Sequence, residues 1–259
     1  SCVSWNHFTH TELASADYDG IVTILDTTTG KPVAAYQEHE RRAWSVDYSP
    51  QDPRRLASGS DDAKVKIWST NDATSALTIF GKANICTVRF SPKDERIITF
   101  GCADHYAYCY DLRRYSEPLY TCQGHRKAIS CIRYLNDDTF VTASTDASLR
   151  SWSHAESGKC LKSYTGHIND KHFVGLSVSH DGQWISCGSE NNNIYTYFAP
   201  LSQPAIVTPF NTTSFLRGQE SRSTDPTLFV SAVAWRRTRN VMLASNSHGE
   251  VKMLRLSDE

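Results

Sequence analysis

The 259-residue sequence lacks an excess of either charge, because 27 basic residues balance 28 acidic ones and the formal net charge is −1. A domain that binds nucleic acid is usually basic, so the composition argues against nucleic acid as a partner. The sequence also lacks an apolar run long enough to span a membrane, and its first residues do not resemble a signal peptide. We therefore expect no membrane partner.

Paired metal-ligand spacings are missing as well, since no CxxC pair occurs among the eight cysteines. Most of these cysteines fall within predicted strands, which favours reduced, packed thiols in a nuclear or cytoplasmic protein. No glycine-rich phosphate-binding loop and no isolated pair of nucleophile and base stand out. The sequence therefore predicts no metal site, no cofactor and no catalytic residue.

A short phrase recurs six times: a run of small residues, a polar corner and an alternating apolar strand. Clear copies are LASGSDDAKVKIW (56–68) and VTASTDASLRSW (141–152). The six corner residues are Asp19, Asp62, Asp104, Asp146, Asn191 and His248, spaced by 43, 42, 42, 45 and 57 residues. A period of roughly 40–45 residues with four short strands per unit is typical of WD-type β-propellers. The sequence therefore predicts an all-β WD-repeat β-propeller, a single domain over residues 1–259 with about six repeats.

The two ends of the sequence affect how this ring would close. The sequence begins within a predicted first strand and ends just after a predicted third strand. Propellers close by pairing strands from both ends, which removes exposed sheet edges. We expect that an N-terminal blade is missing and that the intact ring has seven blades; the alternative is a six-bladed ring with an imperfect seam. A polar stretch over residues 199–229 is expected to be a loop insertion.

Two repeats carry a recurring set of four side chains that can form hydrogen bonds. A buried indole N–H and a buried carboxylate both need partners, so the members of each set are expected to bond to one another. A His–Asp–Ser set also looks like a hydrolase triad, but its recurrence in several repeats favours a structural role. The two sets are His39, Ser58, Asp62 and Trp68, and His125, Thr142, Asp146 and Trp152.

The loops that lead into the first strand of each repeat are rich in basic residues, and they open on the same face as the corners. That face should be positive and should attract an acidic partner. The basic residues are Arg41, Arg42, Lys82, Arg126, Lys127, Lys171 and His172. Tyr18, Trp44 and Phe173 lie among them, and Trp, Tyr and Arg dominate binding hot spots. These aromatic side chains could instead pack against neighbouring blades. The pattern predicts a groove for an extended acidic peptide.

Several runs resemble the WD-repeat domain of the constitutively photomorphogenic E3 ubiquitin ligase and its suppressor-of-phytochrome partners. They include SADYDGIV (15–22), EHERRAWSVDYS (38–49) and FGCADHYAYCYDLR (100–113), and the likeness covers essentially the whole chain. The resemblance implies a substrate-recognition propeller of a ubiquitin ligase complex that acts in light signalling, in the nucleus and cytoplasm. Its top face would bind acidic Val-Pro-type linear motifs of transcription factors and signalling proteins.

The resemblance also implies residue roles. The peptide-binding positions would be Tyr18, Arg42, Trp44, His105, Lys127 and Phe173. Tyr110, Asp111 and Arg113 resemble a box that docks propellers on a cullin-type ligase adaptor, although Asp111 and Arg113 could simply pair with each other. The alternative function is a general WD-repeat scaffold subunit that docks on this adaptor without reading peptides. No RING-type cysteine–histidine array or coiled-coil heptad occurs, so we expect no enzymatic step in this chain. The ligase and its partner subunit are not distinguished.

Overall fold

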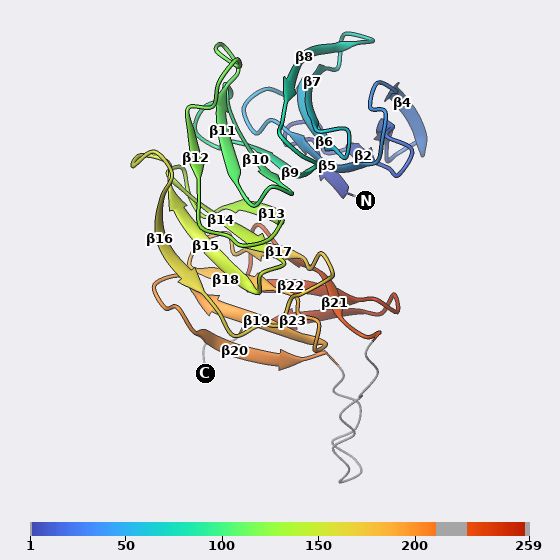
Figure 1. The fold of residues 1–259 in the computed structure, drawn as a ribbon. Helices are drawn as coiled ribbons and strands as arrows, with labels where there is room; N and C mark the ends of the chain where they lie inside the picture. Colours follow the sequence, from blue (N-terminus) through green and yellow to red (C-terminus); the bar gives the residue numbers. More distant parts are fainter. Residues whose placement is uncertain (1, 211–226, 257–259) are drawn as a thin grey trace.

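The computed structural model describes residues 2–210 and 227–256, and these residues form six antiparallel sheets. Five sheets have four strands and one has three, and the sheets succeed one another around a common centre as the blades of a propeller (Figure 1). The prediction of an all-β WD-type propeller with six repeats is confirmed within this part of the chain. The seven-bladed ring stays a prediction.

The strands follow the order of the repeats. The first sheet contains β1 (Cys2–Trp5), β2 (Glu12–Ala16), β3 (Val22–Asp26) and β4 (Lys31–Tyr36). The second contains β5 (Ala43–Tyr48), β6 (Arg55–Ser60), β7 (Lys64–Ser69) and β8 (Ser75–Phe80). The third contains β9 (Ile85–Phe90), β10 (Ile97–Cys102), β11 (Ala107–Asp111) and β12 (Tyr120–Cys122). The fourth contains β13 (Ile129–Tyr134), β14 (Thr139–Ser144), β15 (Ser148–Ser153) and β16 (Lys159–Tyr164). The fifth contains β17 (Leu176–Val178), β18 (Trp184–Cys187), β19 (Asn193–Phe198) and β20 (Pro204–Pro209), and the sixth contains β21 (Val230–Trp235), β22 (Val241–Asn246) and β23 (Val251–Arg255).

Apolar side chains from adjacent blades interlock to form five separate hydrophobic clusters, one for each interface between neighbouring blades. Between the first two blades, for example, Ala14 and Ile24 pack against Val46 and Tyr48, and all four are buried. Each fully buried Val or Ile contributes roughly 1.5–3 kcal/mol relative to exposure. The core of the molecule is therefore a ring of inter-blade layers, which leaves the two rims free for loops.

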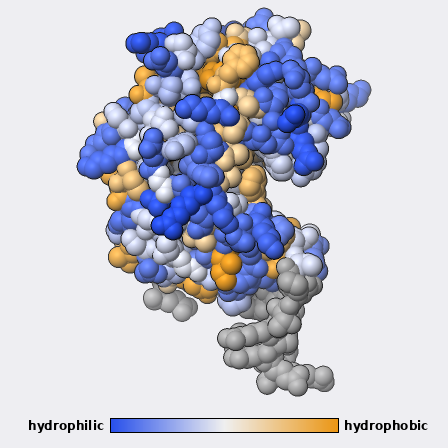
Figure 2. Space-filling view, in the orientation of Figure 1, coloured by the Kyte–Doolittle hydropathy of each residue, from blue (hydrophilic) through white to orange (hydrophobic). Residues whose placement is uncertain are grey.

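The two end faces of this array are apolar but exposed. Val3 and Trp5 occupy the repeat positions of the fully buried Val46 and Tyr48, yet Trp5 is 50% exposed. At the other end, Val251 and Met253 occupy the positions of the buried Val65 and Ile67, and Met253 is 74% exposed. In Figure 2 apolar areas interrupt a largely hydrophilic surface, which is hollowed on the right of the view. The end faces thus have the composition of inter-blade interfaces.

A backbone feature repeats at all six corners. The residue that follows each predicted corner residue has a positive φ: 82° at Gly20, 62° at Ala63, 78° at His105, 59° at Ala147, 57° at Asn192 and 83° at Gly249. Left-handed backbone is costly for most residues other than glycine, so hydrogen bonds around the corners must hold it in place. The sequence repeat is therefore a repeat of turn geometry as well as of composition.

The predicted loop insertion over residues 199–229 is wrong for six of its residues. Pro204–Pro209 form β20, which pairs with β19 as the outer strand of the fifth sheet. The strand was missed because proline stands at both of its ends, and an outer strand tolerates proline because one edge is unpaired. The rest of the predicted insertion includes residues 211–226, which lie outside the described residues.

Strands account for all the regular elements of residues 2–210 and 227–256, and no helix long and apolar enough to cross a membrane occurs among them.

Candidate functional site

Both predicted hydrogen-bond chains are present in the structure. In the second blade, the His39 ring lies 2.8 Å from the Asp62 carboxylate and 2.7 Å from the Ser58 hydroxyl. The indole N–H of Trp68 donates to the same hydroxyl at 2.8 Å. The fourth blade repeats this arrangement with His125, Thr142, Asp146 and Trp152, at 3.0, 2.7 and 2.8 Å. All of these polar groups are engaged inside the blades, so the sets hold the fold together.

The corner carboxylates in these chains gather several donors. The Asp62 carboxylate also accepts the backbone N–H groups of Lys64 at 2.9 Å and Glu40 at 3.2 Å. Burial alone would raise the pKa of Asp62, but the bonds from His39 and these N–H groups outweigh it and lower the pKa to about 2. Asp62 therefore ties the corner to the loop that carries the basic residues.

The first and last corners are stabilised by a different set of hydrogen bonds. The Asp17 carboxylate accepts the backbone N–H groups of Asp19 at 3.0 Å and Ile21 at 2.9 Å. The Asn246 side-chain oxygen does the same for His248 at 3.1 Å and Glu250 at 3.0 Å. Sequence reasoning missed Asp17 and Asn246, which lie two residues before the predicted corners. Asx turns of this kind are a known property of Asp and Asn, and this signal could have identified both residues.

The three predicted aromatic residues lie together on the corner-bearing rim, which we call the top face. The ring centroids of Tyr18 and Trp44 are 5.6 Å apart in an edge-on arrangement, and those of Trp44 and Phe173 are 5.5 Å apart. These residues come from the first blade, the second blade and the loop before the fifth blade. Tyr18 and Phe173 are exposed, and Trp44 is half-buried. The structure therefore forms an aromatic surface from segments far apart in the sequence.

A β-bulge explains why Trp44 can take part. In the pairing of β5 with β6, Ala43 faces Ser60 and Ser45 faces Gly59, so Trp44 is the extra residue. A bulge redirects a side chain away from the alternating pattern of its strand. Cys86, Ser130 and Ser231 occupy the same bulge in other blades. The Trp44 ring is oriented by its indole N–H, which donates to Asp61 at 2.7 Å.

Two basic side chains lie on the same face as this aromatic surface. The Arg42 guanidinium lies 5.5 Å from the centroid of the Tyr18 ring, a cation–π distance. The Lys127 ammonium forms an exposed ion pair with Asp170. Exposed pairs of this kind are worth little, so an incoming carboxylate could displace Asp170 from Lys127 at small cost.

The same rim also carries His105, Lys171 and His172. His105 is exposed and sits at the positive-φ position of the third corner. The backbone N–H groups of Lys171 and His172 both donate to Glu190 at 2.7 Å, which fixes the loop that leads to Phe173. The His172 ring also stacks on Phe229 with centroids 4.2 Å apart. The six predicted peptide positions thus lie on the top face, with Trp44 at the bulge of β5 and the other five on loops or corners.

The predicted adaptor-docking residues differ in their accessibility. Tyr110 is buried and stacks on Phe100 at 5.4 Å. Asp111 is also buried, and the Arg113 guanidinium donates to its carboxylate at 2.5 and 3.0 Å. The Arg113 side chain is 61% exposed. The structure therefore contains the internal Asp–Arg pair, and of the three residues it presents Arg113 to solvent.

All eight cysteines are free thiols, and most are buried. Burial raises the pKa of Cys86 to about 12 and that of Cys109 to about 11. These buried thiols therefore stay protonated at neutral pH, and such thiols are poor nucleophiles.

The class of protein is a WD-repeat β-propeller. It is defined by the recurring blades, by the left-handed corners and by the two chains of His, Asp, Ser or Thr, and Trp. Residues 9–205 match the family model described as "Nucleolar protein 10-like, N-terminal domain". The chain belongs to this β-propeller family, and it is closely related to the WD domains of COP1 and SPA proteins.

Three relatives illustrate this relationship. Protein SUPPRESSOR OF PHYA-105 1 of Arabidopsis thaliana is 45% identical over 99% of this chain and 25% of its own length. E3 ubiquitin-protein ligase COP1 of Pisum sativum is 43% identical over 99% of this chain and 37% of its own length. WD repeat-containing protein RUP2 of Arabidopsis thaliana is 36% identical over 93% of this chain and 67% of its own length. The chain thus spans a quarter of the length of the first relative and little more than a third of the second. It corresponds to their WD domain.

Proposed function

We propose that the top face binds acidic Val-Pro-type linear peptides of transcription factors and signalling proteins, and that this binding recruits substrates to a ubiquitin ligase. The contact of Tyr18, Trp44 and Phe173 carries the proposal. These rings offer an apolar contact surface. Positive charge comes from Arg42, which lies over Tyr18, and from Lys127, which pairs with Asp170 on the loop that carries Phe173. An extended peptide with a small apolar motif next to acidic residues matches both features. Relatives named as E3 ubiquitin-protein ligases support the assignment to such a complex, and we extend it to light signalling and to a nuclear and cytoplasmic location.

The proposal is tested by titrating a fluorescently labelled acidic Val-Pro peptide into wild-type protein and the Trp44→Ala variant. Truncation of an aromatic anchor should cost about 2 kcal/mol or more, which is roughly a 30-fold loss of affinity. Trp5→Ala is the matched control. Trp5 is half exposed, and it lies at the C-terminal end of β1, away from the top face. Unchanged affinity in Trp44→Ala, with its thermal unfolding temperature preserved, would count decisively against the site.

The charge on Lys127 provides a second arm. Lys127→Glu should weaken peptide binding strongly at low salt and weakly at high salt, because exposed charges are screened. Lys93→Glu is the control, since Lys93 forms a similarly exposed ion pair with Asp138. Equal effects of the two variants would show that only the net charge of the protein matters.

Docking on a cullin-type adaptor is the alternative function, and it can coexist with peptide binding. Its support in the structure is the exposed Arg113 side chain, which the buried Asp111 carboxylate holds in place. Arg113→Glu should abolish capture of purified adaptor and leave peptide affinity unchanged. Retention of the adaptor by this variant would remove Arg113 from the docking surface.

A further inference from the structure

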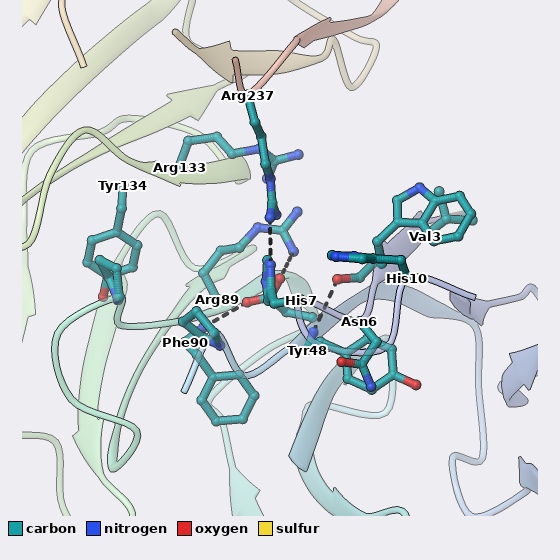
Figure 3. A pocket seen from close by; sticks show the side chains of 15 residues that line it. Val3, Asn6, His7, His10, Tyr48, Arg89, Phe90, Arg133, Tyr134 and Arg237 are labelled. Atoms are coloured by element: carbon teal, nitrogen blue, oxygen red, sulfur yellow. Dashed lines mark hydrogen bonds and ion pairs between the residues drawn. The ribbon is translucent and has the colours of Figure 1, made fainter. Parts of the chain in front are cut away.

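A cavity of about 630 Å³ lies at the rim opposite the top face, and Figure 3 shows the side chains that line it. Trp5, Tyr48, Phe90 and Tyr134 line it, and they stand at the C-terminal ends of the first strands of the first four blades. Trp44, by contrast, lies near the N-terminal end of its strand. The cavity and the proposed peptide site are therefore at opposite ends of the first strands of the blades.

Positive charge dominates this cavity. Arg89, Arg133 and Arg237 line it together with His7 and His10, and Asp47 is the acidic residue among its lining residues in the described part of the chain. Asp47 is already engaged, because its carboxylate accepts Arg89 at 2.9 Å and the backbone N–H of Phe90 at 2.9 Å. Burial opposes the charge of Arg89, but Asp47 outweighs it and raises the pKa of Arg89. Among the described residues that line the cavity, no acidic side chain forms an ion pair with the other two arginines.

Arg133 illustrates this excess. It is half-buried, and its guanidinium donates to the backbone oxygen of Ile132 at 2.7 Å. Within residues 2–210 and 227–256 it forms no salt bridge. Burial lowers the pKa of Arg133, and the nearby positive charge of Arg89 lowers it further. A charge removed from water without a counter-charge is destabilising, so this position favours an anion.

Arg237 reaches the same space from the turn between β21 and β22. Its guanidinium donates to Nδ1 of His7 at 2.7 Å, and Figure 3 shows this pair pointing toward Arg89. Burial and the charge of Arg237 lower the pKa of His7, so the imidazole accepts this bond in its neutral form. The bond therefore joins two blades without neutralising the arginine.

We propose that this cavity binds a small anion that bears phosphate groups, with Arg133 and Arg237 as its main ligands. A guanidinium presents a planar fork of N–H donors that matches phosphate oxygens. The cavity volume falls within the range of small-molecule sites, which combine apolar walls with a few placed polar groups. Phe90 and Tyr134 supply such walls. The site is independent of the peptide-binding proposal.

Sodium pyrophosphate is the probe, and potassium chloride at equal ionic strength is the salt control. At a hundredfold excess over the dissociation constant, pyrophosphate should raise the thermal unfolding temperature by about 5 °C. Isothermal titration calorimetry should show at least about a tenfold loss of affinity in Arg133→Gln. This variant should unfold at or above the wild-type temperature without ligand, because it loses an unpaired charge. Its affinity for the acidic peptide should be unchanged.

Two matched variants separate this site from general charge effects. Arg54→Gln removes an exposed arginine outside the cavity, and Arg42→Gln removes one from the top face. Both should bind pyrophosphate like the wild type. If Arg133→Gln does not fold, Arg237→Gln carries the test, because Arg237 lies on an exposed turn. The proposal is overturned if pyrophosphate has no effect beyond that of chloride, if the cavity variant binds it normally, or if Arg42→Gln abolishes binding.

Discussion

Replacement of Asp62 by asparagine should remove a measurable, pH-dependent part of the stability of the propeller. The Asp62 side chain is 3% exposed, and its carboxylate accepts bonds from His39, Glu40 and Lys64. An asparagine keeps one oxygen acceptor and turns an NH₂ group toward the remaining donors. The corner should therefore lose both charge and hydrogen bonds.

The magnitude follows from the pKa. The pKa of Asp62 falls from 3.8 to about 2 on folding, and one unit corresponds to 1.36 kcal/mol. Because the folded pKa is the lower one, the carboxylate stabilises the fold above pH 3.8 by about 2 kcal/mol, and this contribution is lost as the pH falls through about 2. The free energies of unfolding of wild type and Asp62→Asn should thus differ by about 2 kcal/mol at pH 5 and converge near pH 2.

Urea unfolding followed by circular dichroism at pH 5, 4, 3 and 2 measures this convergence. Asp72→Asn is the control because Asp72 is exposed on the turn between β7 and β8. This variant should match the wild type at every pH. A difference between Asp62→Asn and wild type that is zero at pH 5, or that stays constant down to pH 2, would refute the reasoning.

Two further predictions concern the top face. Gly20→Ala should lower the free energy of unfolding by about 1–3 kcal/mol more than Gly30→Ala does in the same denaturation assay. Both glycines have positive φ, but their surroundings differ. A Cβ at Gly20 would lie 2.5 Å from the backbone oxygen of Arg41, whereas a Cβ at Gly30 would meet nothing within 4 Å. Equal losses would show that the loop moves aside without cost. Asp170→Asn should strengthen binding of the acidic peptide by up to about fivefold at low salt, because it frees Lys127 from an exposed ion pair. The control is Asp138→Asn, which frees Lys93 instead and should not change the affinity. Weaker binding by Asp170→Asn would place Asp170 among the peptide ligands.

The sequence predicts those parts of the structure that repeat. The corner residue recurs at steps of 42 to 57 residues. In two blades a Ser or Thr lies four residues before the corner Asp and a Trp six residues after it, so the blades and their hydrogen-bond chains could be inferred from local patterns. The contact between Trp44 and Phe173 could not be derived in this way, since it joins segments 129 residues apart. Only the loop positions and the family resemblance indicated a shared face.

Features that depend on tertiary structure were missed. The pairing of Lys127 with Asp170 joins loops of different blades. The arginine-rich cavity combines the ends of four strands with two turns, and no motif connects Arg133 with Arg237. Strand β20 was missed because its flanking prolines resemble a loop. In each case the decisive neighbour is distant in sequence.

The six left-handed corners have a consequence for how such propellers diversify. One backbone shape carries glycine, alanine, histidine or asparagine at equivalent points of the rim, as at Gly20, Ala63, His105 and Asn192, and it exposes His105 to solvent. The hydrogen bonds that hold each corner come largely from other residues, so the side chain can change without disturbing the turn where the neighbouring backbone leaves room, as it does at Gly249 but not at Gly20. Related chains can therefore acquire new ligand preferences through single substitutions at the exposed corners, such as those of His105 and Gly249, on an otherwise constant scaffold.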